Sequence, residues 1–472
     1  MSKISVIDSI MIKNEKRLDA EYYKPEFIDV LNVLSKLKCL KMKKVSNSIR
    51  KGIFYILANE YKPRGIPFLR VSNLGNPFIE TKDLVFISEE KNKEHKKTEL
   101  TVGDIAISKG GSLGYIGIIT PDIEKCNICQ DIIGVKIKKE KINPYFLAIF
   151  LLSKYGQLQL ERGRSQQVQP HLTLDVVKNL IIPEFSNDFQ LQIENLVKRA
   201  YEKRKLSEQK YEQAERSLYK LLEISKEDVG KLEKEKSYET DFKNVLESLR
   251  FDAEYYHPKY LGIIKLLEKS PFEIKPLKDV VEISNEKIDP TNGENKTKRF
   301  RYVPIAKINE SGEIFEWDEF YGWQAPSRAR MLIKEKDIVI PSLAGTFDKI
   351  AFVSRELDKQ LTTTGCFVVR VKEDYPEFLF LLLRTPLFKR QLEQQTTGAI
   401  MSAVPKSVFG DLLIPKIPKE KQKEIATLIK EYFKLRKEAR RLIKQAIKKV
   451  EEVIENARNI GTIRESERSS NN

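Results

Sequence analysis

Arg-Leu-Asp-Ala-Glu-Tyr-Tyr-Lys-Pro occupies residues 17–25, and the stretch returns as Arg-Phe-Asp-Ala-Glu-Tyr-Tyr-His-Pro at residues 250–258. The two copies differ at the second and eighth of their nine positions, and the offset from 17 to 250 is 233 residues. That offset is close to half of the 472-residue chain and far exceeds the period of about 20–50 residues that marks a solenoid repeat. The sequence therefore predicts two copies of one whole domain.

Further matches keep nearly the same register downstream. Gly-Asp-Ile-Ala-Ile at residues 103–107 corresponds to Lys-Asp-Ile-Val-Ile at residues 336–340. Ile-Ile-Pro at residues 181–183 corresponds to Leu-Ile-Pro at residues 413–415. A register that holds over so long a stretch indicates two similar domains, and we expect them to read two similar targets at a fixed separation.

The composition favours a polyanionic partner. Lys and Arg total 84 against 68 Asp and Glu, a net charge of +16. Nucleic acid is the usual partner of so basic a protein, although a merely lysine-rich soluble protein is the alternative. The four cysteines are too scattered for a disulfide framework. Early charges argue against a signal peptide, and the longest apolar runs, near residues 146–152 and 378–383, are too short to cross a bilayer. We expect a cytoplasmic protein with no membrane partner.

The first part of each repeat, about residues 15–183 and 250–415, is irregular. Short β-like runs at residues 105–107, 132–137, 338–340 and 367–371 are separated by Gly, Pro, Asn and Asp. Helices are expected after Pro144 and Pro376, because proline is favoured in the first helical turn. The pattern predicts a compact α+β domain in each repeat.

The second part of each repeat has the spacing of a coiled coil. Seam positions are spaced by three or four residues at 189, 193, 196, 200, 204, 207, 211, 214, 218 and 221. The second series runs through 425, 428, 432, 435, 439, 442 and 446, then 450, 453 and 457 after a shift of one residue. Each helix would be about 35 residues, or ~50 Å, long. We expect the two helices to pair with each other, although packing of each helix on its own domain alone is the alternative.

The predicted fold class is α+β, with two similar mixed α/β domains separated by two long helices that form an antiparallel coiled coil. The predicted boundaries are 1–183 for the first domain, 184–249 for the first helical region and linker, 250–415 for the second domain, 416–460 for the second helical region and 461–472 for a disordered tail.

Three short motifs invite a catalytic interpretation, and a structural one is favoured for each. Gly-Gly-Ser-Leu-Gly at residues 110–114 lacks the Lys-Ser or Lys-Thr of a phosphate loop and predicts a tight turn. Asn143-Pro144-Tyr145-Phe146 lacks one proline of the NPPY/F motif of amino-methyltransferases and predicts a helix start. Cys126-x-x-Cys129 has no second ligand pair, which favours ordinary half-buried cysteines. With three histidines in the chain, none of them beside a nucleophile, we predict a non-catalytic binding protein without catalytic or metal-binding residues.

Candidate DNA-binding residues are Arg, Lys, Gln, Ser and Thr in loop-rich segments. Arg pairs naturally with guanine and Gln with adenine in the major groove, and a turn of small residues lets the backbone approach a phosphate closely. In the first repeat the candidates are Lys62, Arg64, Arg70, Lys109, Ser112, Arg162, Arg164, Gln166 and Gln167. In the second repeat they are Arg299, Arg301, Lys307, Arg328, Arg330, Thr346, Gln395, Thr396 and Thr397. The alternative for each residue is a solvated surface side chain.

The order and duplication of these motifs resemble the specificity (S) subunits of type I restriction–modification systems. The likeness rests on the Arg-x-Asp-Ala-Glu-Tyr-Tyr-x-Pro openings, the Gly-Asp-Ile-x-Ile-Ser strand, the Ile-Ile-Pro or Leu-Ile-Pro exits and the two long helices, from about residue 15 to about residue 458. The resemblance implies two target recognition domains, each of which reads one half of a split, asymmetric sequence in double-stranded DNA. It implies that the helices measure the unread gap.

The resemblance also implies that the chain binds no cofactor and has no catalysis of its own. Two methyltransferase (M) subunits would supply modification with S-adenosylmethionine, and restriction (R) subunits would use ATP and Mg²⁺. Residues 51–97 and 285–330 have little in common, which fits two unlike half-sites. Two other hypotheses stay open. A degenerate DNA methyltransferase or nuclease would need a cofactor or metal site, and a coiled-coil scaffold would not contact DNA.

Overall fold

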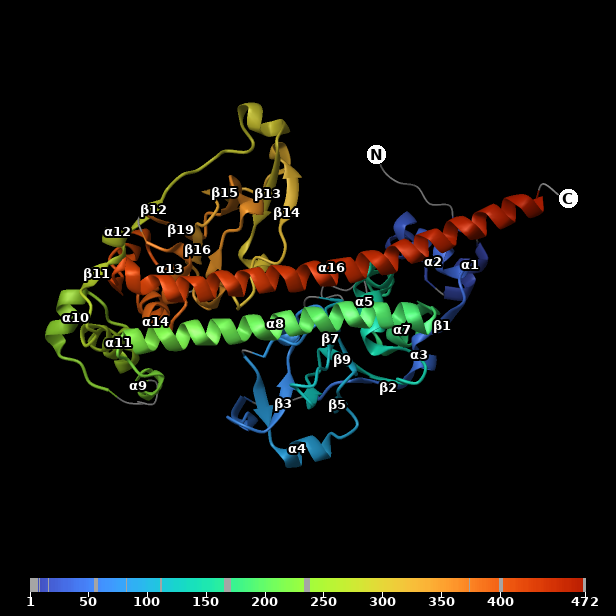
Figure 1. The fold of residues 1–472 in the computed structure, drawn as a ribbon, viewed down its shortest axis with the longest axis horizontal. Coiled ribbons are helices and arrows are strands. Elements are labelled where there is room, and N and C mark those ends of the chain that lie inside the picture. Colours follow the sequence, from blue (N-terminus) through green and yellow to red (C-terminus); the bar gives the residue numbers. More distant parts are fainter. Residues whose placement is uncertain are drawn as a thin grey trace. The chain divides into compact units, whose positions relative to one another are not determined.

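The fold is given by a computed structural model that describes residues 7, 9–15, 17–54, 58–81, 83–110, 113–164, 171–232, 238–372, 374–398 and 402–469, without the side chains of residues 11, 14, 58 and 457–469. Contacts divide the chain into two units: residues 1–204 with 436–472, and residues 205–435. The division cuts both long helices, α8 (Asn187–Leu221) and α16 (Lys419–Ser469) (Figure 1). Each unit therefore contains part of both helices.

The first unit is built on short strands and helices that precede α8. Its strands are β1 (Cys39–Lys41), β2 (Ser46–Lys51), β3 (Ile66–Leu69), β4 (Val85–Ile87), β5 (Leu100–Thr101), β6 (Ile105–Ser108), β7 (Ile116–Ile118), β8 (Lys125–Ile128), β9 (Ile132–Ile137) and β10 (Ile181–Pro183). Its helices before α8 are α1 (Ser9–Glu15), α2 (Pro25–Ser35), α3 (Met42–Val45), α4 (Glu89–Glu94), α5 (Pro144–Leu152), α6 (Lys154–Arg162) and α7 (Leu174–Asn179).

The second unit contains a matching set of elements. Its strands are β11 (Ile274–Pro276), β12 (Val281–Ser284), β13 (Arg299–Val303), β14 (Asp318–Tyr321), β15 (Ala329–Ile333), β16 (Ile338–Pro341), β17 (Ala351–Phe352), β18 (Gln360–Thr363), β19 (Cys366–Val371) and β20 (Leu413–Pro415). Its helices before α16 are α9 (Lys226–Lys231), α10 (Phe242–Ser248), α11 (Pro258–Glu268), α12 (Leu277–Val280), α13 (Pro376–Leu383), α14 (Pro386–Gln394) and α15 (Lys406–Phe409).

The strand order is the same in both units, which confirms the predicted duplication. The first unit has sheets β2-β9-β6-β7, β4-β3-β8-β5 and β1-β10, and the second has β12-β19-β16-β17, β14-β13-β18-β15 and β11-β20. Even the parallel pairs correspond, since β3 runs parallel to β8 and β13 runs parallel to β18. The segments 51–97 and 285–330, whose sequences share little, thus contribute equivalent strands β3, β4, β13 and β14.

Each unit contains a buried helix that begins with a proline. Pro144 begins α5 and Pro376 begins α13, as predicted, and both helices are buried nearly all round. The Asn143 side chain accepts hydrogen bonds from the backbone N–H groups of Tyr145 (2.9 Å) and Phe146 (3.2 Å). Asn143 is therefore a helix cap, which confirms the predicted helix start.

The long helices pair within each unit along the predicted seam positions and along positions next to them, such as Val197 and Ile429. In the first unit Ile193, Val197 and Ala200 of α8 share a core with Leu442, Ala446 and Val450 of α16. In the second unit Ala214 and Leu218 of α8 share a core with Ile425, Leu428 and Ile429 of α16. The later part of α8 packs with the earlier part of α16, so the helices run antiparallel. The α+β class and the antiparallel coiled coil are both confirmed.

The end of α16 differs from the prediction in two respects. The buried position after Val450 is Ile454, with Val453 half-buried, because the seam there advances by four residues rather than three. The helix continues to Ser469, so residues 461–469 of the predicted disordered tail are helical, and residues 470–472 lie outside the described residues. Among the described residues, no helix combines the length and apolar character that a membrane span requires.

Candidate nucleic-acid interface

The strand ends at one edge of the sheet β2-β9-β6-β7 bring one predicted DNA-binding residue of the first unit, Lys109, beside two residues that were not predicted, Lys51 and Asp131. Strand β2 ends at Lys51, which pairs with Ile133 of β9, and β6 ends at Ser108, which pairs with Ile132. The Lys109 backbone N–H donates a hydrogen bond to the carbonyl oxygen of Asp131 at 2.7 Å. Two lysines and one aspartate therefore meet where these strands end or begin.

Lys109 is electrostatically unusual for a surface lysine. Partial burial is the main cause that lowers its pKa below the ordinary value, and the positive charge of nearby Lys51 lowers it further. Asp131 acts in the opposite direction without cancelling these effects. An incoming phosphate would favour the charged form of both lysines, which makes this edge suited to a polyanion.

The chain after α6 returns to the same edge. The Leu172 backbone N–H donates to the Lys109 carbonyl oxygen at 3.0 Å. A Cβ on Gly110 would lie 3.2 Å from His171 Nδ1 and 3.3 Å from Asp131 Oδ1, so the close approach favours glycine there. Gly114 adopts a φ of +76°, which agrees with the predicted tight turn. The candidates Ser112, Gln166 and Gln167 lie outside the described residues.

The equivalent edge of the second unit has the same construction. After β16, the Ser342 and Ala344 backbone N–H groups donate to Gly365 and Ser402 carbonyl oxygens, both at 2.9 Å. The candidate Thr346 follows in this turn, and its hydroxyl donates to the Leu343 carbonyl oxygen at 2.7 Å. The loop after α14 therefore meets the turn after β16, as the chain after α6 meets the turn after β6.

Two further candidates, Thr397 and Arg328, lie on the loop after α14 and beside this edge. Thr397 exchanges two backbone hydrogen bonds of 2.9 Å with Ala403, whose neighbour Val404 donates to Ser342. Arg328 is exposed, and its carbonyl oxygen accepts a hydrogen bond of 2.9 Å from Thr364, next to Gly365. Thus Arg328, Thr346 and Thr397, which are widely separated in sequence, are brought to one edge of the second unit.

Other candidates make contacts within their own unit. Arg70 donates to the Asp83 carbonyl oxygen at 2.7 Å, and Lys62 and Arg64 are exposed near β3. Arg164 lies 3.7 Å from Glu161. The structure places Gln395 and Thr396 at the end of α14, where the Thr396 hydroxyl donates to the Glu393 carbonyl oxygen.

Arg162 packs inside the first unit rather than at the strand edge. Its guanidinium carbon lies 3.7 Å from the centre of the Tyr22 ring, and its Nε donates to the Tyr22 carbonyl oxygen at 3.3 Å. Glu15 lies 3.6 Å from Arg162 Nη2. The side chain therefore joins the end of α6 to the opening motif of the repeat.

The remaining basic candidates of the second unit are paired with acids. Arg299 and Arg301 each lie 3.2 Å from Glu319, across the β13–β14 pair. Arg330 lies 3.4 Å from Asp289, and Lys307 pairs with Glu316. Exposed pairs of this kind contribute at most about 1 kcal/mol, so a phosphate could compete for these side chains.

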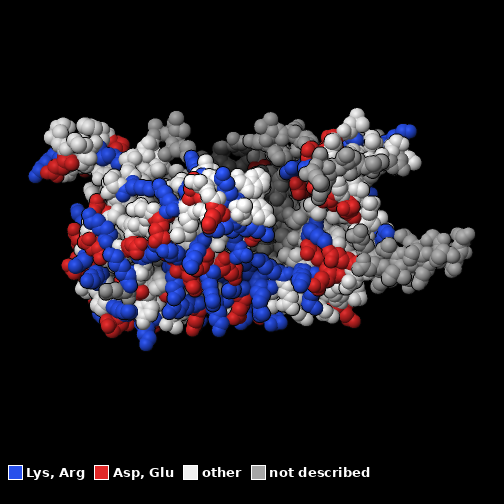
Figure 2. All heavy atoms as spheres, turned by 90° about the horizontal axis from the view of Figure 1, so that it is seen from above, with Lys and Arg blue, Asp and Glu red and all other residues white. Residues whose placement is uncertain are grey.

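Sequence reasoning missed Lys51 and Asp131. The available signal was weak: a basic Arg-Lys pair, Arg50-Lys51, stands at the exposed end of a strand just before Gly52. On the face that Figure 2 shows, Lys and Arg side chains are dense and Asp and Glu side chains lie among them. This face carries mixed charge, so the net positive charge does not by itself locate a binding site.

The motifs predicted to be structural show no arrangement for chemistry among the described residues. Cys126 is buried, Cys129 is half-buried and both are free thiols, as predicted. Burial raises the pKa of both thiols, which disfavours the thiolate that a nucleophile or metal ligand needs. Within the described ranges, no group of three or more His, Cys, Asp or Glu side chains could hold a metal ion.

Comparison with known families identifies the repeated architecture. A family model described as the type I restriction modification DNA specificity domain matches the chain twice, at residues 35–216 and 269–449. These two matches cover most of the sequence and correspond to the two repeats.

Individual relatives are more distant. The putative type I restriction enzyme MjaX specificity subunit of Methanocaldococcus jannaschii is 23% identical over 440 residues, which is 87% of this chain and 90% of that protein. The type I restriction enzyme EcoBI specificity subunit of Escherichia coli is 28% identical over 137 residues, and this match spans 29% of each chain. A crystal structure of a type I restriction-modification S subunit from M. genitalium is 13% identical over 89% of this chain and 94% of that one, with a TM-score of 0.38.

Proposed function

The chain belongs to the family of type I restriction modification DNA specificity proteins and carries the family's domain twice, and from this we propose that it is the subunit that selects the DNA target. Each repeat would read one half of a bipartite sequence in double-stranded DNA. The chain itself would bind no cofactor and catalyse no step.

The observation that carries this proposal is the pair of equivalent strand edges. In the first unit the turn after β6 is hydrogen-bonded to the segment that follows α6. In the second unit the turn after β16 is hydrogen-bonded in the same way to the segment that follows α14. The framework is the same, whereas the side chains differ: Lys51 and Lys109 lie at one edge, and Arg328, Thr346 and Thr397 lie at the other. Equal frameworks with unlike contact residues are suited to two unlike half-sites.

The division of labour between these residues follows from general physics. Lysines such as Lys51 and Lys109 would contact phosphates and supply most of the affinity, together with its dependence on salt. Arginine, threonine and glutamine would supply base preference, at about 1–3 kcal/mol for each good bidentate pair. The acidic side chains that pair with Arg299 and Arg330 would repel phosphates and so weaken non-specific binding of DNA by these arginines.

Partners would supply the chemistry. We infer two methyltransferase subunits, which use S-adenosylmethionine, and restriction subunits, which use ATP and Mg²⁺. The duplication supports two equivalent docking positions, because each motif copy exposes its second, apolar residue: Leu18 is 88% exposed and Phe251 is 78% exposed. The paired helices α8 and α16 would set the length of the unread gap between the half-sites.

A domain exchange tests the proposal. Residues 51–183 are replaced by the corresponding segment of a relative with a different target, and the methylated motif is read from the genome of cells that also express the methyltransferase partner. We expect one half of the motif to change while the other half and the gap stay the same. A motif that is unchanged, or one that changes in both halves, would contradict one domain per half-site.

A second measurement separates this proposal from an enzymatic function. Titration calorimetry of the isolated chain with S-adenosylmethionine should show no binding. Tight binding would instead support a degenerate methyltransferase. A scaffold function predicts that the assembled complex retards no duplex in a gel, whereas the specificity function predicts retardation of duplexes that carry the motif.

A further inference from the structure

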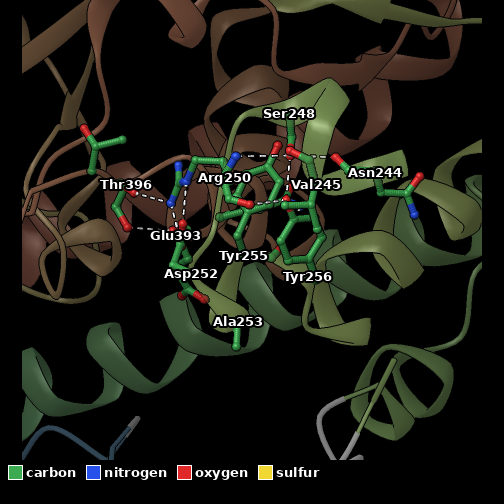
Figure 3. A network of polar contacts seen from close by, with 12 residues as sticks. Asn244, Val245, Ser248, Arg250, Asp252, Ala253, Tyr255, Tyr256, Glu393 and Thr396 are labelled. Atoms are coloured by element: carbon green, nitrogen blue, oxygen red, sulfur yellow. Dashed lines mark hydrogen bonds and ion pairs between the residues drawn. The ribbon is translucent and has the colours of Figure 1, made fainter. Parts of the chain in front are cut away.

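The motif that opens the second repeat forms a bonded cluster around Arg250 (Figure 3). The guanidinium of Arg250 binds both carboxylate oxygens of Asp252, with Nε and Nη2 each 2.7 Å from an oxygen. The guanidinium carbon also lies 4.5 Å from the centre of the Tyr255 ring. These contacts fix the side chain in one orientation, and the bidentate bond lowers the pKa of Asp252 and raises that of Arg250.

In that orientation Arg250 reaches the loop after α14. Its Nη2 donates a hydrogen bond of 3.1 Å to the carbonyl oxygen of Thr396. Two residues earlier, the Gln394 side chain donates to the Tyr255 carbonyl oxygen at 3.1 Å. The motif therefore holds the end of α14 and the first residues of the loop through two separate bonds.

The far part of this loop lies at the candidate DNA-binding edge. Thr397 pairs with Ala403, Ser402 accepts from Ala344, and Val404 donates to Ser342. A displacement of Thr396 would thus be transmitted to Thr397 and to the turn that carries Thr346. Arg250 has no direct place at this edge, since its bonds are to Asp252 and Thr396.

The first repeat shares the arginine–aspartate pair and the bond between the motif and the preceding helix. Arg17 binds Asp19 at 2.8 and 2.6 Å and lies 4.3 Å from the centre of the Tyr22 ring. Arg162, at the end of α6, donates to the Tyr22 carbonyl oxygen, as Gln394 does to Tyr255. Both motif copies therefore hold the helix that precedes a candidate recognition loop.

From this geometry we propose that Arg250 is a positioning residue for base recognition: it fixes residues 395–398, and through them residues 402–404, so that these residues can read the second half-site. The inference rests on the proposed function. A charge-assisted bond to a backbone carbonyl does not depend on the side chain of the residue that accepts it. The bond from Arg250 can therefore hold this loop whatever its side chains are, which fits a motif that is repeated with two changes while the two loops differ.

The same cluster offers a matched control. On the side away from the loop, Ser248 Oγ and Tyr256 Oη lie 2.6 Å apart, the Arg250 backbone N–H donates to Ser248 Oγ at 3.4 Å, and Tyr256 donates to the Arg250 carbonyl oxygen at 2.5 Å. Replacing Ser248 with alanine weakens the cluster without removing the bond to Thr396. A purely structural role of the cluster predicts that Ser248→Ala and Arg250→Met act alike.

The experiment uses the full-length chain in complex with its methyltransferase partner and a library of randomised DNA duplexes. Bound duplexes are sequenced for the wild type, Arg250→Met, Arg250→Lys and Ser248→Ala, and thermal unfolding of each complex is recorded. For Arg250→Met we expect base preference at one half-site to fall by about 10-fold or more, the other half-site being unaffected, with partial recovery in Arg250→Lys. Ser248→Ala should lower the unfolding temperature without changing base preference.

Three outcomes would overturn the inference: unchanged preference in Arg250→Met, an equal loss at both half-sites, or the same change in Ser248→Ala. Failure of the proposed function has a different signature, because the wild-type complex itself would then select no bipartite sequence from the library.

Discussion

Lys51 ends β2 and Lys109 directly follows β6, yet the positive charge of Lys51 helps to lower the pKa of Lys109. Two like charges at one edge are unfavourable in the free protein. They become favourable when a phosphate approaches, because the anion compensates both charges. The close placement of Lys51 and Lys109 therefore favours a site for an anion.

We expect Lys109→Gln to weaken binding about equally on all DNA sequences. The slope of log affinity against log salt should decrease by about 1, because one phosphate contact is lost. Filter binding of the assembled complex between low and high salt measures the slope. An unchanged slope would show that Lys109 contacts no phosphate.

The same lysine gives a pH dependence of known sign. Binding favours the charged form, and burial with Lys51 has lowered the pKa of Lys109 in the free protein. The affinity for DNA should therefore fall as the pH rises through that lowered pKa. With a lysine of ordinary pKa in its place, the same fall would begin only at higher pH. Lys109→Arg, which stays charged, should remove this fall, and a fall that persists in Lys109→Arg would assign it to another group.

Arg328 is the arginine that we propose to read a base in the second half-site. Its side chain is exposed, and its backbone is bonded to Thr364 beside the edge that carries Thr346. We expect Arg328→Ala to reduce affinity for the correct motif by about 1–3 kcal/mol and to relax preference at one base pair of the second half-site. Competition binding with singly substituted duplexes measures both effects, and a uniform loss on every duplex would make Arg328 a phosphate contact instead.

At the scale of elements, α8 is fastened to its domain by a buried arginine in the predicted seam. Arg204 Nη2 donates to the carbonyl oxygen of Ile79 at 3.1 Å and to Glu80 Oε2 at 2.7 Å. The Arg204 side chain is about 10% exposed, whereas that of Glu80 is 27% exposed. This polar contact explains why the apolar spacing of α8 is interrupted at residue 204.

We expect Arg204→Met to destabilise the first unit by about 1–3 kcal/mol, since Glu80 and the Ile79 carbonyl oxygen lose a partner that solvent replaces only in part. The neighbouring Lys203 provides the control. Its pair with Glu438 of α16 spans 2.8 Å between side chains that are 42% and 31% exposed, so Lys203→Met should cost less than about 1 kcal/mol.

Hydrogen exchange measures the local stability of these two variants, and it does not require the whole chain to unfold in one step. Peptides that contain β3 and β4 should exchange faster in Arg204→Met, with peptides of the second unit as the internal reference. Equal protection in the two variants would mean that the contact between Arg204 and Glu80 does not hold the domain on its helix.

Elements with strong local signals could be predicted from the sequence. The strands β6, β9, β16 and β19 are apolar runs, α5 and α13 begin with proline, and α8 and α16 keep a heptad spacing. By contrast, β14 reads Asp-Glu-Phe-Tyr and is mostly exposed, so no alternation indicates its equivalence to β4. That equivalence appears only through long-range pairing, such as the parallel contact between β13 and β18.

The candidate site could be predicted only in part, because its assembly depends on long-range pairing. The turn after β6 and the segment after α6 were both identified, but their contact depends on pairings across tens of residues that no local pattern contains. Lys51 was missed because its place beside Lys109 requires the register of β2 on β9. The position of Arg162 against Tyr22 could not be foreseen, because 140 residues separate them.

At the scale of the whole molecule, the helix pair has a defined register. Lys203 of α8 pairs with Glu438 of α16 in the first unit, and Lys210 pairs with Glu431 in the second. A step of seven residues forward along α8 thus corresponds to seven residues backward along α16. This is the register of an antiparallel heptad seam, and it permits whole heptads to be inserted without exchanging the buried and exposed faces.

We therefore expect a matched insertion to change the gap in the DNA target. Seven residues of heptad sequence are inserted after Ala200 in α8 and seven at the register-matched position after Arg440 in α16. The added length is about 10 Å, or about three base pairs at 3.4 Å each, so the preferred gap should lengthen by about three base pairs. Affinity for this longer site should be lower than that of the wild type for its own site, because three base pairs also rotate one half-site by about 100° around the duplex.

Selection from a library with variable gap lengths measures the change, with the two half-site sequences held constant. Insertion in α8 alone is the control, since it breaks the register of the two ion pairs and should select no single gap. A matched insertion that still prefers the original gap would show that the helix pair does not measure the spacing, whereas altered half-sites with a constant gap would place the effect in the domains themselves. The proposed function therefore predicts that the two half-site sequences and the gap length can be changed separately, the first through the strand edges and the second through the helix pair.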